Sequence, residues 1–116
     1  MRFLAPAVGA LLTGLTVSAA GAAVPNSIAS LLGPSVGYLL AQSDLCGWSL
    51  NDRIRTTYHK DFAQIGLTDA QQGMVWQQAQ ARETKLTSLP PKAKAGMKSG
   101  ICNSAARAEV EQQLAD

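Results

Sequence analysis

The chain has few of the side chains from which catalytic centres are built. Its 116 residues include one histidine, His59, and two cysteines, Cys46 and Cys102. Any Ser–His or Cys–His nucleophilic centre would have to use this single imidazole. Helical spacing places His59 beside Tyr58 but toward solvent, which favours a solvated histidine over a catalytic one. The sequence therefore predicts no catalytic residue, and we expect that the protein is not an enzyme.

Metal-binding and redox motifs are also missing from the sequence. The two cysteines are separated by 55 residues, whereas a redox-active pair is normally spaced as Cys-X-X-Cys so that the second thiol resolves a mixed disulfide quickly. The chain has neither a zinc-ligand spacing nor a calcium loop, and its carboxylates are scattered. We expect no bound metal and no cofactor.

Charge is absent from the first third of the chain, since no charged residue lies between Arg2 and Asp44. Residues 3–17 are dominated by Leu, Ala and Val, as in the apolar core of a signal peptide. The small residues at 20–22 match the small-any-small pattern of a cleavage site. The sequence therefore predicts a signal peptide over residues 1–22.

The alternative is that this segment is retained as a membrane anchor. Residues 3–23 are just long enough to span a bilayer, and the protein would then be a membrane-tethered accessory subunit. Pro6, Gly9 and Gly14 argue against a spanning helix. We expect cleavage, with no stable membrane insertion afterwards.

Cleavage would leave a chain that is nearly neutral. Arg2 is one of ten Lys and Arg residues, so nine remain against eight Asp and Glu, a net charge of +1. That balance implies neither a nucleic-acid partner nor an anionic membrane surface.

The even number of cysteines behind an export signal points to an oxidising compartment, the periplasm or the cell exterior. There Cys46 and Cys102 are expected to form one disulfide, although free thiols, intermolecular pairing and a reactive thiol remain as alternatives. In the chain-entropy model, closing a ring of this size stabilises the fold by roughly 4 kcal/mol.

Helical periodicity covers most of the remaining chain, and no stretch alternates as a strand would. Residues 23–34 contain proline, serine and asparagine and are expected to form a flexible, extended segment before a helical domain over 35–116. Within that domain the apolar spacing predicts helices over 35–46, 50–65, 69–87 and 92–98, and a last helix that begins at Asn103 or Ser104 and reaches Leu114. The predicted fold class is all-α, a small bundle of four to five short helices held by one disulfide.

Two capping boxes are predicted at helix starts. Ser49 with Asp52 resembles the motif with Asp in place of Glu, and Thr68 with Gln71 matches it directly. Because only Leu67 separates the Gly66 helix stop from Thr68, we expect the two flanking helices to be antiparallel.

A binding surface is the remaining candidate site. Trp48 and Trp76 can line a ligand groove, although such rings more often anchor the core of a small helical domain. Lys92, Lys94 and Lys98 form a modest basic patch that can contact phosphate or an acidic partner, although a solvated face is the simpler interpretation.

The run Leu45-Cys46-Gly47-Trp48, followed by the distant Cys102 before a capped helix, resembles small uncharacterised exported bacterial proteins. The resemblance implies a helical fold tied by a disulfide and implies no activity, cofactor or catalytic residue. In size and bridge spacing the chain is also similar to the small acid-stress chaperones of the periplasm.

These observations favour an exported, non-enzymatic helical protein, a protein-interaction or chaperone-like module for envelope stress, with an unknown protein partner. The alternatives are a small enzyme that uses the thiol of Cys46 or Cys102 or the imidazole of His59, and the membrane-tethered subunit. The sequence makes no prediction of oligomeric state.

Overall fold

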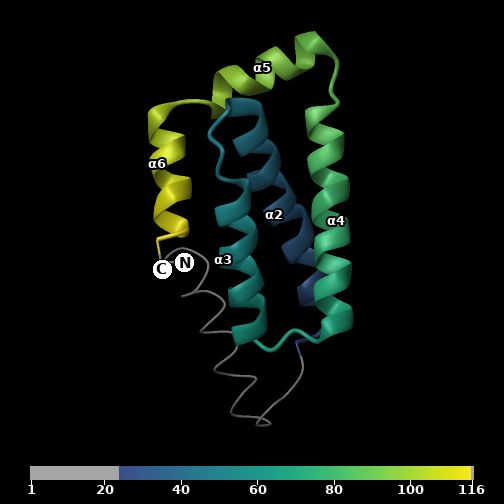
Figure 1. Ribbon diagram of the computed structural model, residues 1–116. Coiled ribbons are helices and arrows are strands. Elements are labelled where there is room, and N and C mark those ends of the chain that lie inside the picture. The colour runs from purple at the N-terminus through teal and green to yellow at the C-terminus, as the bar shows by residue number, and fades with distance from the viewer. Residues whose placement is uncertain (1–23, 116) are drawn as a thin grey trace.

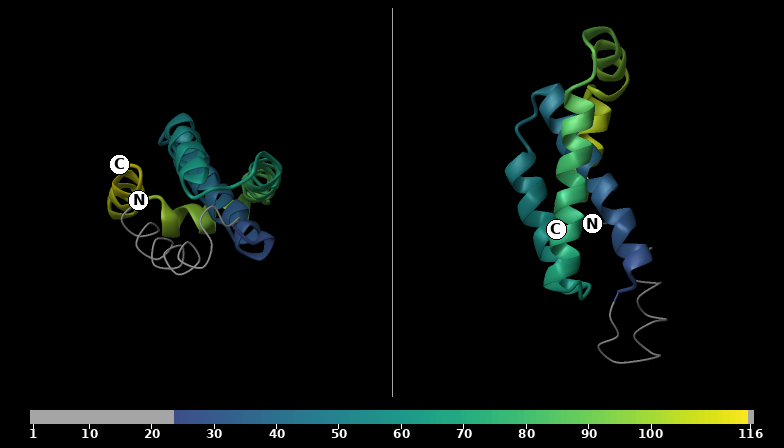
Figure 2. Two further views of the ribbon diagram at one scale, coloured as in Figure 1. Left: turned by 90° about the horizontal axis from the view of Figure 1, so that it is seen from below. Right: turned by 90° about the vertical axis from the view of Figure 1, so that its right-hand side faces the viewer.

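The computed structural model describes residues 24–115, which contain helices and no strand. The helices are, in chain order, α2 (Asn26–Cys46), α3 (Asn51–Gln64), α4 (Asp69–Thr87), α5 (Pro91–Ile101) and α6 (Ser104–Gln113). Helices α2, α3 and α4 run side by side, α5 lies across one end of this group, and α6 returns along the side opposite α4 (Figures 1 and 2). The predicted all-α fold is confirmed, while the predicted signal peptide lies outside the described residues.

Helix α2 begins at Asn26, nine residues before the predicted start at residue 35. Pro25 precedes it in an extended conformation, and Pro34 lies inside the helix. Ala29 and Leu32 are buried, so packing of this first half outweighs the backbone hydrogen bond that the proline ring removes. The prediction of a flexible, extended segment over residues 23–34 is therefore wrong from Asn26 onward.

The capping box predicted at the start of α4 is confirmed. The amide of Gln71 donates to the Thr68 hydroxyl at 3.1 Å, and the amide of Thr68 donates to the Gln71 side chain at 3.0 Å. The Gln71 side-chain amide also donates to the Val24 carbonyl at 2.6 Å and to the Asn26 side chain at 2.9 Å. One buried glutamine therefore joins the starts of α2 and α4.

The capping box predicted at the start of α3 is wrong. Ser49 has a positive φ of 59°, and the N-cap residue is Leu50, which makes no side-chain cap bond. The amide of Leu50 instead donates to the buried hydroxyl of Ser43 at 2.8 Å. The amide that precedes α3 is therefore satisfied by a side chain of α2, and α3 itself has no side-chain cap.

Helices α2 and α4 pack with little space between their backbones. A Cβ atom built on Gly33 would lie 2.6 Å from the Cβ of Gln78, and one built on Gly37 would lie 2.5 Å from the carbonyl oxygen of Ala79. Both glycines are buried, and only a residue without a side chain fits at either position. This close contact makes α2 and α4 the tightest pair in the bundle.

The core lies between α2, α3 and α4. Its largest fully buried apolar side chains are Phe62, Leu40, Ile54 and Val75. Helix α6 adds Val110, and Leu114 just after it is also buried. Helix α5 has no buried residue, so it connects α4 to α6 without entering the core.

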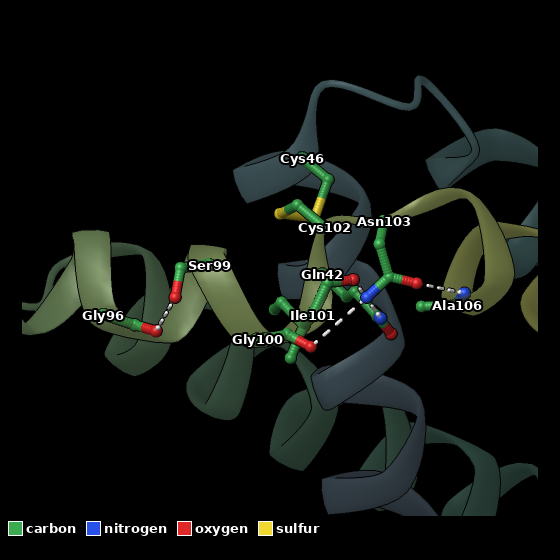
Figure 3. Close-up of a disulfide and its surroundings, with 9 residues drawn as sticks. All are labelled: Gln42, Cys46, Gly96, Ser99, Gly100, Ile101, Cys102, Asn103 and Ala106. Atoms are coloured by element: carbon green, nitrogen blue, oxygen red, sulfur yellow. Dashed lines mark hydrogen bonds between the residues drawn. A yellow bond between two sulfur atoms is a disulfide. The ribbon is translucent and has the colours of Figure 1, made fainter.

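The predicted disulfide is confirmed. Cys46, the last residue of α2, is bonded to Cys102, with the two Cα atoms 5.2 Å apart. Beside the bond, the side-chain amide of Gln42 donates to the carbonyl of Ile101 at 3.1 Å, and the Asn103 side chain caps α6 by accepting from the amide of Ala106 at 2.8 Å (Figure 3). The end of α2 thus holds the corner between α5 and α6.

Candidate functional site

The structure separates the two tryptophans of the predicted binding surface. Trp48, in the turn between α2 and α3, is 9% exposed and belongs to the core. Trp76, on α4, is half-buried and packs against the core from outside. Only Trp76 therefore presents a ring to a ligand.

Trp76 forms one wall of a surface pocket of about 450 Å³. The other walls come from α3, through Arg55, Thr56, His59 and Lys60. These four positions form two pairs of adjacent residues, and the second pair follows the first by one helical turn. All four therefore lie on one face of α3. We call this hollow the Trp76 pocket.

The ring of Trp76 is held in place from two sides. On the core side, the ring of Phe62 lies 5.6 Å from it between centroids, at an interplanar angle of 57°. On the solvent side, the Arg55 guanidinium carbon lies 5.9 Å from the ring centroid, within the range of a cation–π contact. The pocket therefore has a fixed aromatic wall beneath a positive charge.

A polar network links this pocket to α2. Glu83 on α4 accepts hydrogen bonds from Arg55 at 3.2 Å and from the Asn51 side chain at 3.3 Å. The same Asn51 amide donates to Asp44, at the end of α2, at 2.9 Å. Three helices thus meet through four polar side chains.

Two carboxyl groups in this network, those of Asp44 and Glu83, accept from the same side-chain amide of Asn51. Burial, together with a hydrogen bond and the charge from Asp44, raises the pKa of Glu83 to about 7, while Arg55 opposes the shift. The pair therefore binds a proton near neutral pH. No nucleophile or substrate cavity accompanies the pair in the described part of the chain, so we assign it to the helix interface.

Tyr58 is the other group with a strongly shifted pKa. Burial raises its pKa to about 12, and the charge of Asp61 adds to the effect. Its ring packs against Phe62 with the centroids 5.9 Å apart. Tyr58 is therefore a neutral core residue at physiological pH.

The predicted lysine patch lies elsewhere. Lys92, Lys94 and Lys98 belong to α5, where Lys92 and Lys98 are exposed and Lys94 is half-buried. Helix α5 lies across the end of the bundle at which α3 begins (Figure 1), whereas the pocket includes Lys60 in the second half of α3. The structure therefore does not bring the lysines and the tryptophans into one surface.

The alternative of an enzyme that uses the thiol of Cys46 or Cys102 requires a free cysteine, and the described residues contain none. His59 is exposed on the pocket wall, and neither cysteine is among the lining residues. Between residues 24 and 115 there is also no group of three His, Cys, Asp or Glu side chains placed to hold a metal ion.

A second hollow region lies along α2. Two adjoining depressions of about 400 Å³ and 390 Å³ share Tyr38, Leu39 and Gln113 in their walls. Each has a single charged lining residue, Arg82 in one and Glu109 in the other. Neither concentrates charge beside an aromatic ring, so the Trp76 pocket is the stronger candidate site.

None of the described helices has both the length and the apolar character that crossing a membrane requires. Residues 3–23, which were considered as a retained membrane anchor, lie outside the described part of the chain.

Sequence reasoning missed Arg55, Asn51 and Glu83 as members of one site. Asn51 and Arg55 lie on α3 and Glu83 lies on α4, and no local motif connects the two helices. It also missed the packing role of Gly33 and Gly37, although a signal was present: Ala29, Gly33, Gly37 and Ala41 recur at every fourth position, which places small residues in one line along a helix.

No protein-family model, curated protein or solved structure matches the chain. The resemblance to exported bacterial helical proteins therefore stays a prediction, and the functional argument rests on the site itself.

Proposed function

We propose that the protein is an exported, non-enzymatic helical module that acts in the periplasm or outside the cell. It acts by binding other proteins, as an interaction module or as a chaperone-like protein under envelope stress. The observation that carries the proposal is the Trp76 pocket. An aromatic ring that packs against Phe62 and is bordered by basic side chains of α3 has the composition of a protein-binding surface, in which Trp and Arg are enriched.

The proposed location is supported by the intramolecular disulfide between Cys46 and Cys102. Such bonds persist in oxidising compartments and are rare in the cytosol. The signal-peptide pattern over residues 1–22 points the same way.

The function is tested with the purified, oxidised mature protein and a model client that aggregates on heating or acidification. Light scattering should fall as the protein is added. We expect W76A to lose most of this protection. The matched control L31A removes a side chain that is 65% exposed on α2 and should protect as well as wild type.

A second variant separates a folding defect from a binding defect. Lys60 is exposed, so K60E should leave the helical circular dichroism signal and the melting temperature unchanged while it alters client protection. If the wild-type protein suppresses no aggregation and crosslinks to no cell-envelope protein, the proposed function is wrong.

A further inference from the structure

We propose that the Trp76 pocket binds an acidic peptide segment, with a carboxylate between Arg55 and Lys60 and a neighbouring apolar side chain against the Trp76 ring. This inference rests on the proposed function, because it names the chemical class of the bound segment. It concerns residues that the sequence did not single out, apart from Trp76 and His59.

Arg55 has unused capacity for a carboxylate. Its guanidinium has five N–H donors in a planar fork, and within the described residues it makes one hydrogen bond, to Glu83 at 3.2 Å. Its side chain is 45% exposed. The remaining donors are therefore reachable from solvent. The contact with Glu83 shows that the guanidinium already donates to a carboxylate in this position.

Positive charge gathers on the pocket side of α3. Arg55 and Lys60 lie on either side of His59, and all three are exposed. Asp52, one turn before Arg55, is the nearest acidic residue on that face of the helix.

The facing helix adds little negative charge to oppose a ligand. One turn before and after Trp76 on α4 are Gln72 and Gln80, both uncharged. The next charged side chain along α4 on this side is Glu83, which is paired with Arg55. An anionic segment therefore meets attraction from α3 and no unpaired carboxylate from the middle of α4.

The aromatic wall favours a peptide over a simple anion. Phosphate has no apolar part to cover the Trp76 ring, whereas an acidic segment with an interspersed aromatic or aliphatic residue fills both halves of the pocket. A volume of about 450 Å³ accommodates two to three side chains, within the usual size range of ligand pockets.

Glu83 competes with such a ligand for Arg55. A glutamine at this position keeps an oxygen that can accept from Arg55 but removes the negative charge. At pH 8, where the carboxyl of Glu83 is ionised, E83Q should therefore bind an acidic segment about three- to fivefold more tightly than wild type, which is the change expected for one partly exposed ion pair. A gain of affinity cannot result from partial unfolding.

The experiment titrates the oxidised mature protein with two synthetic peptides, one of alternating glutamate and phenylalanine and one with glutamine in place of glutamate, by isothermal calorimetry. We expect the glutamate peptide to bind at least tenfold more tightly. K60Q should weaken its binding about two- to fivefold, and E83Q should strengthen it. K92Q removes the same charge from α5 and should leave the affinity unchanged.

Equal binding of the two peptides, an effect of K92Q as large as that of K60Q, or full competition by inorganic phosphate at the peptide's own concentration would overturn the assignment. The proposed function is judged separately by client protection. If the double variant H59Q/K60Q protects clients as well as wild type, this pocket is not the binding site, although the protein is still an interaction module.

Discussion

At the scale of single residues, Gly37 illustrates how a missing side chain determines packing. Its sequence neighbours do not require glycine, because it lies within a regular helix. The requirement comes from α4, where the carbonyl oxygen of Ala79 and the Cβ of Arg82 would lie 2.5 Å and 2.7 Å from an added Cβ. Backbone atoms cannot swing aside as the end of a flexible side chain can, so the two helices would have to separate.

We expect G37A to lower the free energy of unfolding by about 2 to 3 kcal/mol, the usual cost of overpacking at a tight contact. The matched control is G73A in α4, where an added Cβ meets nothing within 4 Å. Because glycine is a poor helix former, G73A should raise stability by about 0.5 to 1 kcal/mol. Urea unfolding followed by circular dichroism measures both. Equal effects of the two substitutions would show that helix propensity, and not the contact with α4, determines the outcome.

At the scale of helices, the polar network of Asp44, Asn51, Arg55 and Glu83 joins the end of α2 to α3 and α4. Hydrophobic packing alone leaves helices free to rotate or slide slightly against one another. Directional hydrogen bonds restrict that freedom, and Glu83 lies where the three helices meet. Its protonation state therefore affects how the helices are held together.

The pH dependence of stability follows from the pKa of Glu83, which rises from 4.5 to about 7 on folding. Since the folded state holds the proton more tightly, this contribution is complete below about pH 4.5 and is lost as the pH rises through about 7. We expect wild type to lose about 1 to 2 kcal/mol relative to E83Q between pH 5 and pH 8, allowing for solvent screening of the exposed partner Arg55.

Chemical unfolding at several pH values tests this expectation. E109Q is the control, because Glu109 is exposed. Its stability should follow the wild-type pH profile. Parallel profiles for wild type and E83Q would mean that the carboxyl pair does not take up a proton on folding.

At the scale of the whole molecule, stability is unevenly distributed. Helices α2, α3 and α4 and the turns between them contain most of the buried core, whereas α5 has no buried residue and α6 has one, Val110. The disulfide joins these two parts at the corner between α5 and α6. The covalent bond is therefore most important for the part of the chain with the least apolar burial.

Replacing both cysteines by serine should lower the free energy of unfolding by about 2 to 5 kcal/mol. We expect the loss to be local first: amide hydrogen exchange in α5 and α6 should accelerate much more than in α3 and α4. Wild type treated with reductant should match the double variant. Uniform acceleration along the chain would contradict the uneven distribution of stability.

The sequence alone determined where most helices form, because helix formation depends on interactions between residues that are close in the chain. Apolar spacing, the Thr68–Gln71 capping box and the Pro90–Pro91 break each act within one or two turns, and the structure confirms the helices that they predict. The cysteine pairing was also predictable, since the sequence contains only two cysteines and an oxidising compartment pairs them.

The tertiary structure decided what depends on distant partners. Pro34 locally opposes a helix, and burial against α4 imposes one. The amide of Leu50, just before α3, donates to Ser43 in α2. The Trp76 pocket gathers side chains from two helices, and its Arg55 pairs with a carboxylate 28 residues away. A sequence pattern reports the conformations that neighbouring residues prefer. Which faces then meet is determined by packing, because burial and close contact act between residues irrespective of their separation along the chain.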